Sequence, residues 1–241
     1  MPTRIDSPAA AGVPAGRRRV RRQLRWAVPL LLVAIVFVGY ALPPYLTFDP
    51  SRSRLPVPEA HPQYYPLLVA HIVFGSVALL AGCFQVWPWF RRRYPVAHRW
   101  MGRAYFFGGV FPAGVAVLGV APLSSTGFVS RVGNTMLAVL WLATAVAGYR
   151  MARQRRFVDH RRWMVRSFAL TLSIVANRLW VVLFVVLLTP QLDTTYGGDQ
   201  DALIRAAAGA SVWMSWVVNL LVAEWWLERG PARGRTRPVG T

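Results

Sequence analysis

Six long apolar runs, separated by short polar segments, dominate the chain. Each run has about twenty residues, which is the length a helix needs to cross a hydrocarbon core of about 30 Å. Bare backbone N–H and C=O groups find no partner in hydrocarbon, so each crossing must be helical. We predict membrane-spanning helices near residues 26–46, 64–88, 103–121, 133–149, 167–189 and 206–227. The predicted fold is therefore all-α, a bundle of six transmembrane helices.

The polar positions between the runs are rich in arginine. All 28 basic residues are Arg, and the formal net charge is +19. Twenty-three of them lie before the first run, around the second and fourth connections, or after the sixth run. The other connections hold only Arg52, Arg54, Arg131 and Arg205. The positive-inside rule then places both termini in the cytoplasm (N-in, C-in). Because topology accounts for the charge, we expect no nucleic-acid partner.

Two stretches resemble each other and suggest an internal repeat. "VAHRWMGRAYF" spans 96–106, and "VDHRRWMVRSF" spans 158–168. Each follows an arginine-rich turn and opens an apolar run. We therefore predict two parallel helical hairpins that form a four-helix core within residues 64–189, with the first and last helices beside it. Residues 26–227 make up the membrane domain, and the basic tails 1–25 and 228–241 are predicted to be disordered.

The repeat contains the first candidate site. His98 begins a face that includes Gly102, Tyr105 and Gly109, and His160 begins one that includes Met164, Ser167, Thr171 and Arg178. Histidines at one depth on two helices suit bis-imidazole ligation of a haem iron. Two other interpretations remain open. The histidines could bond the hairpin turns, with Asp159 as partner of His160. Alternatively, the helix N-termini could bind a lipid phosphate or another anion with the help of Arg99, Arg103, Arg162 and Arg166.

A second candidate site lies deeper in the membrane, where ionisable residues are costly and therefore often functional. His71 begins a stripe of mainly small residues on the second helix, namely Gly75, Ala78 and Gly82, followed by Gln85. Such a stripe permits close helix packing or contact with a flat ligand. Arg178 lies near the middle of the fifth helix and needs a polar partner. We hypothesise an intramembrane site of His71 and Arg178, with Asn177 and Asn219 as neutral polar neighbours and Glu224 closer to the cytoplasm.

Other residue types narrow the range of functions. Cys83 is a single cysteine inside an apolar run, so no disulfide framework is possible and we expect it to pack in the core. Trp100 and Trp163 fit an interfacial aromatic belt. The first run is long enough to span and lacks a clear cleavage site, which predicts an uncleaved anchor. No hydrolytic triad, P-loop or zinc motif is found.

The segments "HIVFGSVALLAGCFQ", "HRWMGRAYFF" and "DHRRWMVRSFALTLSIVANRLW" resemble the bacterial membrane-protein family called domain of unknown function 2306. The resemblance covers roughly residues 64–185. The residues of this chain that fall on the family's sequence pattern are His71, His98 to Arg103, His160 to Arg166, and Arg178. The layout also looks like that of the two-haem transmembrane cytochromes b that accept electrons from ascorbate. The predicted helix 133–149 lacks a histidine, so that likeness implies at most one bis-histidine haem.

These observations lead to one functional hypothesis and two alternatives. The leading one is a haem-b electron-transfer protein of the bacterial cytoplasmic (inner) membrane, with His98 and His160 as axial ligands and with His71 and Arg178 lining a site further out. The first alternative is a cofactor-free transport, proton-linked or membrane-maintenance protein that uses His71 and Arg178. The second is a helper subunit that binds a protein partner through its cytoplasmic loops. Membrane lipids are expected partners in every case.

Overall fold

A computed structural model of the protein describes residues 15–229. The predicted disorder of residues 1–14 and 230–241 lies outside this range. Within it, one prediction about the tails is wrong, because the first helix begins at Ala15 and residues 15–25 are helical. Arginines are good helix formers, and the run "RRRVRRQLRW" extends the first apolar helix toward the N-terminus without a breaking residue.

The described part of the chain is all helical, and its six long apolar helices could each cross a membrane. The predicted fold class is thereby confirmed. The main elements are α1 (Ala15–Ala41), α2 (Tyr64–Val86), α3 (Pro88–Arg93), α4 (Pro95–Tyr105), the π-helical η3 (Phe106–Val110), α5 (Phe111–Val120), α6 (Phe128–Arg153), α7 (Phe157–Thr171), α8 (Ser173–Leu188) and α9 (Gln200–Glu228). Short 3₁₀ turns are η1 (Pro43–Thr47), η2 (Pro50–Arg52), η4 (Ala121–Leu123) and η5 (Thr189–Gln191).

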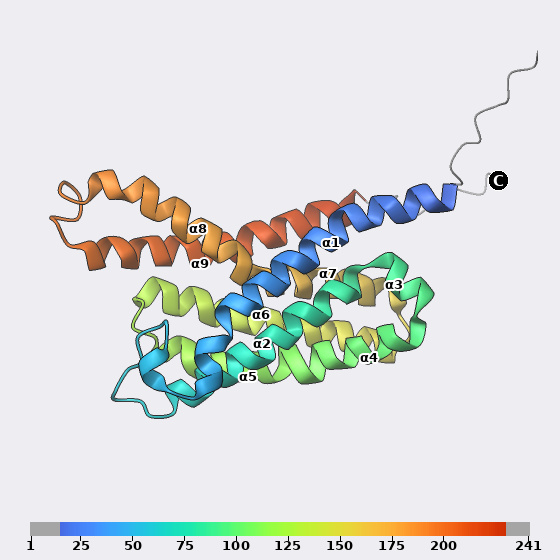
Figure 1. Ribbon diagram of the computed structural model, residues 1–241, viewed down its shortest axis with the longest axis horizontal. Coiled ribbons are helices and arrows are strands. Elements are labelled where there is room, and N and C mark those ends of the chain that lie inside the picture. The colour runs from blue at the N-terminus through green and yellow to red at the C-terminus, as the bar shows by residue number, and fades with distance from the viewer. Residues whose placement is uncertain (1–14, 230–241) are drawn as a thin grey trace, which may run out of the picture.

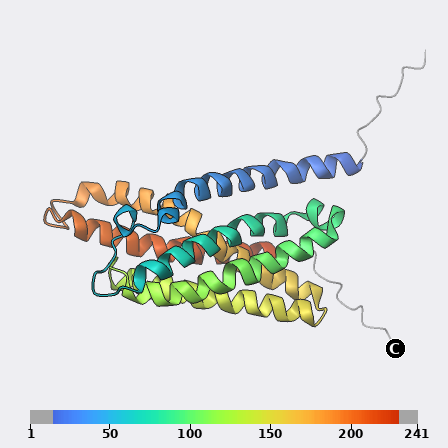
Figure 2. The same cartoon turned by 60° about the horizontal axis from the view of Figure 1, so that its bottom comes forward.

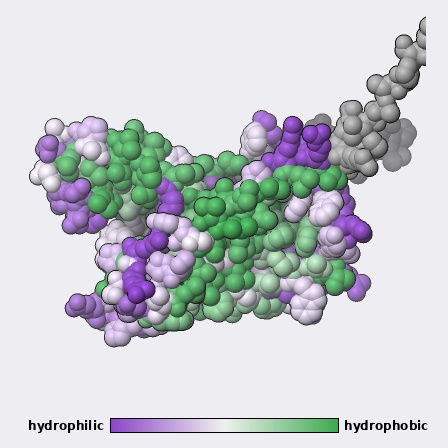
Figure 3. Space-filling view, viewed as in Figure 1, coloured by the Kyte–Doolittle hydropathy of each residue, from purple (hydrophilic) through white to green (hydrophobic). Residues whose placement is uncertain are grey.

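The helices run roughly along one long axis (Figures 1 and 2). The start of α1, the α3–α4 turn and the end of α9 lie at one end of the molecule, which also holds the arginine-rich turns. The α1–α2 and α8–α9 connections lie at the other end. Figure 3 shows broad apolar surface between hydrophilic patches at the two ends, as a hydrocarbon layer requires. The start of α1 and the end of α9 thus lie on the same side of the apolar band, as predicted.

The two predicted hairpins are present, formed by α2 with α4–α5 and by α6 with α7. Their shared core contains the fully buried Tyr105, Val110 and Ala145 together with Leu79. The sixth span also contributes, because Val212 and Trp216 of α9 belong to the same core. Of the fifth span, α7 contributes Phe168 and Leu170 to this core, and Leu172 and Val175 at the break pack against it. The four-helix core within 64–189 therefore needs α9 as an additional member.

The helices that carry His98 and His160 begin earlier than predicted. We expected them to start near residues 103 and 167, but α4 starts at Pro95 and α7 at Phe157. Pro95 suits the first turn, where a missing N–H removes no hydrogen bond. The arginines that interrupt the apolar pattern are therefore inside helices, in the interfacial turns. Both histidines lie in the first turns of their helices rather than in the loops.

The third and fifth spans are each interrupted. In the third, the five-residue π-turn Phe106–Val110 precedes Pro112, whose ring cannot fit above the carbonyl of a regular α-helical turn. In the fifth, the helix breaks at Leu172, where the hydroxyls of Thr171 and Ser173 bond the backbone carbonyls of Ser167 and Leu170. As a result α8 leaves the bundle and packs chiefly along α9 (Figure 1).

Candidate functional site

His160 lies in the first turn of α7 and is oriented by the neighbouring helix α6. Its Nδ1 lies 2.8 Å from the backbone oxygen of Gly148. A carbonyl can only accept, so Nδ1 carries the proton and Nε2 is left with its lone pair. Gly148 is buried, and a Cβ there would lie 2.8 Å from the sulfur of Met164. The glycine therefore permits the close approach of α6 and α7 at the level of this hydrogen bond.

His98 lies in the first turn of α4, on the partner hairpin. Its backbone oxygen accepts a hydrogen bond of 2.9 Å from Nε2 of Gln85, near the end of α2. Within the described part of the chain, its own Nδ1 is buried and has no hydrogen-bond partner. A buried polar atom without a partner costs about 1–3 kcal/mol, so this nitrogen calls for an explanation. Gln85 fixes the start of α4, and the imidazole itself is left without a protein partner.

The two histidines lie at the same end of the bundle, in the first turns of α4 and α7, and His98 is within electrostatic range of His160 and Arg91. Both arginine-rich turns lie at this end, and the pKa of the Arg91 guanidinium is lowered, first by partial burial and then by the charges of Arg161 and Arg92. Residues 15–229 contain no group of three or more metal-ligating side chains. Within these residues, a metal ion would therefore find at most two side chains of the types His, Cys, Asp and Glu at one place.

One alternative for His160 is wrong. Asp159 does not bond the histidine; its carboxylate pairs with Arg156, at 2.8 Å. The hairpin turn is thus closed by Arg156 and Asp159, both largely exposed, while His160 bonds the buried carbonyl of Gly148. The histidine faces the helix next to it rather than the turn.

The predicted anion-binding arginines fall into two groups. Arg166 is engaged, because its guanidinium makes a two-point ion pair with Glu224 of α9, with Nη2 2.8 Å from Oε2. Arg99, Arg103 and Arg162 are exposed. Arg103 lies over the Trp100 ring at 4.7 Å, and Arg166 lies over Trp163 at 4.8 Å, so the Trp–Arg contact is alike in the two copies of the repeat. The pairing also gives Glu224 a role, since it joins α9 to α7.

The predicted intramembrane site is not assembled. His71 does point inward: its Nδ1 lies 3.0 Å from the oxygen of Ala113 on α5, and its ring meets Trp141 of α6 edge to face, at 6.5 Å. Arg178 lies on the exposed side of α8, which the break at Leu172 carries away from α2. Asn177 bonds Ser211 at 3.3 Å. The four residues therefore do not converge, and Arg178 is not the partner of His71.

Asn219 instead joins two helices. Its Nδ2 donates to the backbone oxygen of Ala169 at 3.0 Å, close along α9 to Glu224. Two polar side chains of α9 thus hold α7, one by an ion pair and one by a hydrogen bond. In a low-dielectric environment such bonds favour one helix packing over others.

A buried hydrogen-bond network connects the two hairpins, and sequence reasoning gave it no role. The Tyr105 hydroxyl lies 2.8 Å from both Ser167 Oγ and Thr171 Oγ1, and Trp141 Nε1 donates to Thr171 Oγ1 at 2.9 Å. Thr171 donates to the backbone oxygen of Ser167 at 2.9 Å. Because the Thr171 hydroxyl proton is used in that bond, the Tyr105 hydroxyl must donate to Thr171 Oγ1, and the Ser167 hydroxyl must donate to the Tyr105 oxygen. The sequence did contain a signal for this network, because helical periodicity places Tyr105, Ser167 and Thr171 on the faces that begin at His98 and His160.

The small residues of α2 serve close packing. A Cβ at Gly82 would lie 2.5 Å from the ring of Phe168, and one at Gly109 would lie 2.8 Å from the backbone of Ala78. The Gly75 position has open space around it. The stripe that begins at His71 therefore receives an aromatic ring and a neighbouring helix at its centre.

Comparison with protein families identifies the chain. The family model described as "Predicted membrane protein (DUF2306)" matches residues 68–227, from α2 to nearly the end of α9. The chain belongs to the DUF2306 family. The match includes His71, His98, His160 and Glu224. This DUF2306 protein has no match among curated proteins or solved structures. It is a multi-pass membrane protein of that family, and no comparison links it to the transmembrane cytochromes b.

Proposed function

We propose that this DUF2306 protein holds one haem b between His98 and His160 and transfers electrons at the arginine-rich end of its bundle, in the bacterial cytoplasmic membrane. The observation that carries the proposal is the buried Nδ1 of His98, which has no partner in the described part of the chain. Ring nitrogens of two histidines from facing helices are the usual axial ligands of a haem in a helical bundle.

The surroundings of His160 support the same role. Its Nδ1 donates to the Gly148 carbonyl at 2.8 Å, which holds the ring in one tautomer and makes Nε2 more basic. A backbone carbonyl behind a ligating histidine is a common second contact in metal sites. On the other hairpin, Gln85 holds the backbone of His98 and thereby keeps α4 in place against α2. A carbonyl of α6 thus positions the His160 ring, and a side chain of α2 positions the backbone that carries His98.

The charges nearby suit a group that carries two carboxylates. Arg99, Arg103 and Arg162 are exposed beside the histidines, and guanidinium groups bind carboxylates strongly through paired N–H donors. Arg166 is excluded from this role because Glu224 occupies it. When bound, haem b supplies one-electron oxidation and reduction, and the chain contributes ligands, orientation and charge.

The test is a reduced-minus-oxidised absorption spectrum of the full-length protein, produced with added haem precursor and purified in detergent. We expect a Soret band and an α band in the wild type and their loss in His98→Ala and His160→Ala. His71→Ala and His61→Ala serve as matched controls and retain both bands, because neither residue belongs to the proposed ligand pair. Circular dichroism and gel filtration verify that each variant is folded. A colourless wild type, or a spectrum that survives loss of either ligand, contradicts the proposal.

A further inference from the structure

The end of the molecule opposite the histidines has a hollow of about 500 Å³. It lies between the last turn of α1 and the loop that follows, and it is lined by Gly39, Tyr40, Pro43, Pro44, Thr47, Arg52 and Arg54. Two of the four arginines at this arginine-poor end therefore converge on one hollow. Because positive charge is scarce at this end, its concentration in one place requires a reason beyond topology.

Arg54 is held in place at this hollow. Its guanidinium carbon lies 3.7 Å above the centre of the Tyr40 ring, and its backbone N–H donates to the hydroxyl of Tyr45, at 3.3 Å. Tyr45 is itself almost completely buried, so the anchor is rigid. The cation–π contact uses the flat face of the guanidinium and leaves the N–H groups at its edge free to donate. No carboxylate within residues 15–229 forms an ion pair with Arg54.

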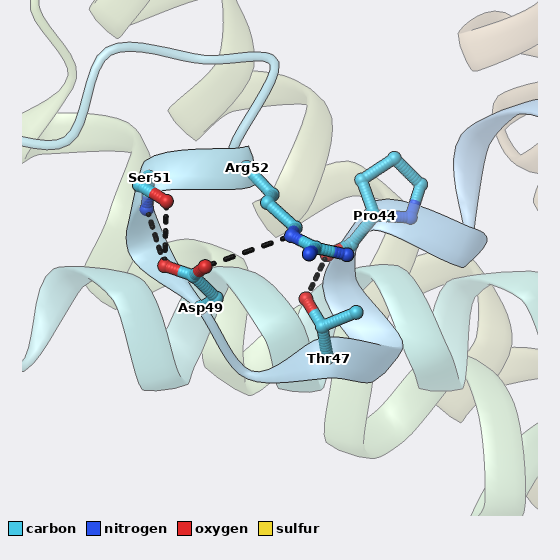
Figure 4. A network of polar contacts seen from close by, with 5 residues as sticks. All are labelled: Pro44, Thr47, Asp49, Ser51 and Arg52. Carbon is cyan, nitrogen blue, oxygen red and sulfur yellow. Dashed lines mark hydrogen bonds and ion pairs between the residues drawn. The ribbon is translucent and has the colours of Figure 1, made fainter.

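Arg52 pairs with a carboxylate, so the charges of the two arginines that line the hollow are neutralised to different extents. Its Nε lies 3.6 Å from Oδ2 of Asp49, whose other oxygen accepts from the N–H and hydroxyl of Ser51 at 2.9 and 2.8 Å (Figure 4). The hydroxyl and backbone hydrogen bonds of Ser51 hold the pKa of Asp49 below its usual value of 3.8, so the carboxylate is ionised at neutral pH. Asp49 offsets Arg52, and Arg54 leaves a net positive charge.

The apolar surface next to the hollow indicates where its ligand comes from. Below it, α1 exposes Leu32 (55%), Val36 (70%) and Tyr40 (60%) toward the hydrocarbon layer. In the same segment, Leu46 of η1 and Phe48, the residue that follows η1, expose 55% and 70% of their surface. Apolar side chains at this level place the turn in the interfacial zone of the bilayer, where lipid headgroups lie. An anion at Arg54 would therefore continue into an acyl chain along α1.

We propose that this hollow binds the phosphate of an anionic phospholipid, with Arg54 as its principal donor and the acyl chains against the exposed face of α1. Arg52 and the Thr47 hydroxyl line the same hollow and contribute weaker polar contacts. This site is independent of the histidine pair and of any cofactor held there. It serves to fix the otherwise lightly packed α1 to the leaflet at the arginine-poor end.

The test measures lipid binding to the delipidated full-length protein in detergent by native mass spectrometry. Phosphatidylglycerol and phosphatidylcholine of the same chain length are the two probes, and inorganic phosphate is the competitor. We expect a tighter Kd for phosphatidylglycerol, and we expect Arg54→Gln to weaken it about fivefold, as one interfacial cation predicts. Arg205→Gln is the matched control, since Arg205 is exposed at the same end but pairs with Asp199 at 3.5 Å.

A second variant guards against loss of binding through misfolding. Asp49→Asn keeps an oxygen for the Ser51 hydrogen bonds but removes the charge that offsets Arg52, so we expect phosphatidylglycerol to bind more tightly. The proposal is overturned if Arg54→Gln and Arg205→Gln behave alike, or if phosphatidylcholine binds as well as phosphatidylglycerol. It is also overturned if inorganic phosphate displaces the lipid at equal concentration, because the acyl chains would then contribute nothing.

Discussion

Replacing Gly109 with Ala tests whether close contact between α2 and the π-turn Phe106–Val110 holds the bundle together. An added Cβ would lie 2.8 Å from Cα and 2.9 Å from Cβ of Ala78. Ordinary carbon–carbon contacts begin at about 3.5 Å, so the new methyl group is roughly 0.7 Å too close. The atoms it meets belong to the backbone or lie next to it, and no flexible side chain can move aside. The two segments must therefore separate.

Overpacking of this kind costs about 1–3 kcal/mol, and the better helix propensity of Ala returns up to about 1 kcal/mol. We expect Gly109→Ala to lower the free energy of unfolding by about 1–2 kcal/mol. The assay is reversible unfolding in mixed micelles of mild detergent and dodecyl sulfate, followed by circular dichroism. Gly75→Ala is the matched control on α2, because its Cβ would meet nothing within 4 Å. Equal stability of the two variants, or a stabilised Gly109→Ala, refutes the close-contact argument.

Two further changes probe the polar contacts between helices by the same unfolding assay. Glu224→Gln removes the two-point ion pair with Arg166, and we expect the free energy of unfolding to fall by about 1 kcal/mol. The loss is small because Glu224 keeps 39% of its side-chain surface exposed and solvent screens the pair. If the double variant Arg166→Gln/Glu224→Gln loses as much stability as the two single variants added together, the two residues are not coupled. Thr171→Val leaves Trp141 Nε1 without its acceptor and Tyr105 without one of its two partners, so we expect a loss of about 1–3 kcal/mol. Thr135→Val, at an exposed hydroxyl on α6 that bonds its own helix, is the control and should change stability little; a similar loss in both variants would contradict the network.

The spans could be predicted because apolar length alone decides whether a helix crosses a membrane. The break within the fifth span could not, because it depends on local detail that apolar length does not record. Leu172 lies within an apolar run, yet α7 ends beside it because the hydroxyls of Thr171 and Ser173 on either side bond backbone carbonyls. That break places Arg178 on the outside of α8 and separates it from His71. A prediction that assumed one straight helix therefore brought together two residues that the fold keeps apart.

The candidate site was predicted in part for a related reason. Periodicity placed Tyr105, Ser167 and Thr171 on inward faces, and these faces do meet in the core. Which atoms bond could not be predicted, since that depends on how far each hairpin is shifted along the other. Gly148 is one example: nothing in its sequence context marks its carbonyl as the acceptor for His160.

The spacing from histidine to tryptophan differs by one residue between the two copies of the repeat, and this difference explains why their histidines are not equivalent. The second copy has an extra Arg between its histidine and its tryptophan. One residue turns an α-helix by about 100°, so His160 and His98 point in different directions relative to the Trp–Arg pairs that follow them. Those pairs, Trp100 with Arg103 and Trp163 with Arg166, remain alike. Before those pairs, His160 donates from Nδ1 to the Gly148 carbonyl, whereas within residues 15–229 the buried Nδ1 of His98 has no hydrogen-bond partner. An exact repeat would place both rings alike; this one holds the His160 ring through a backbone carbonyl and leaves the His98 ring without such a bond.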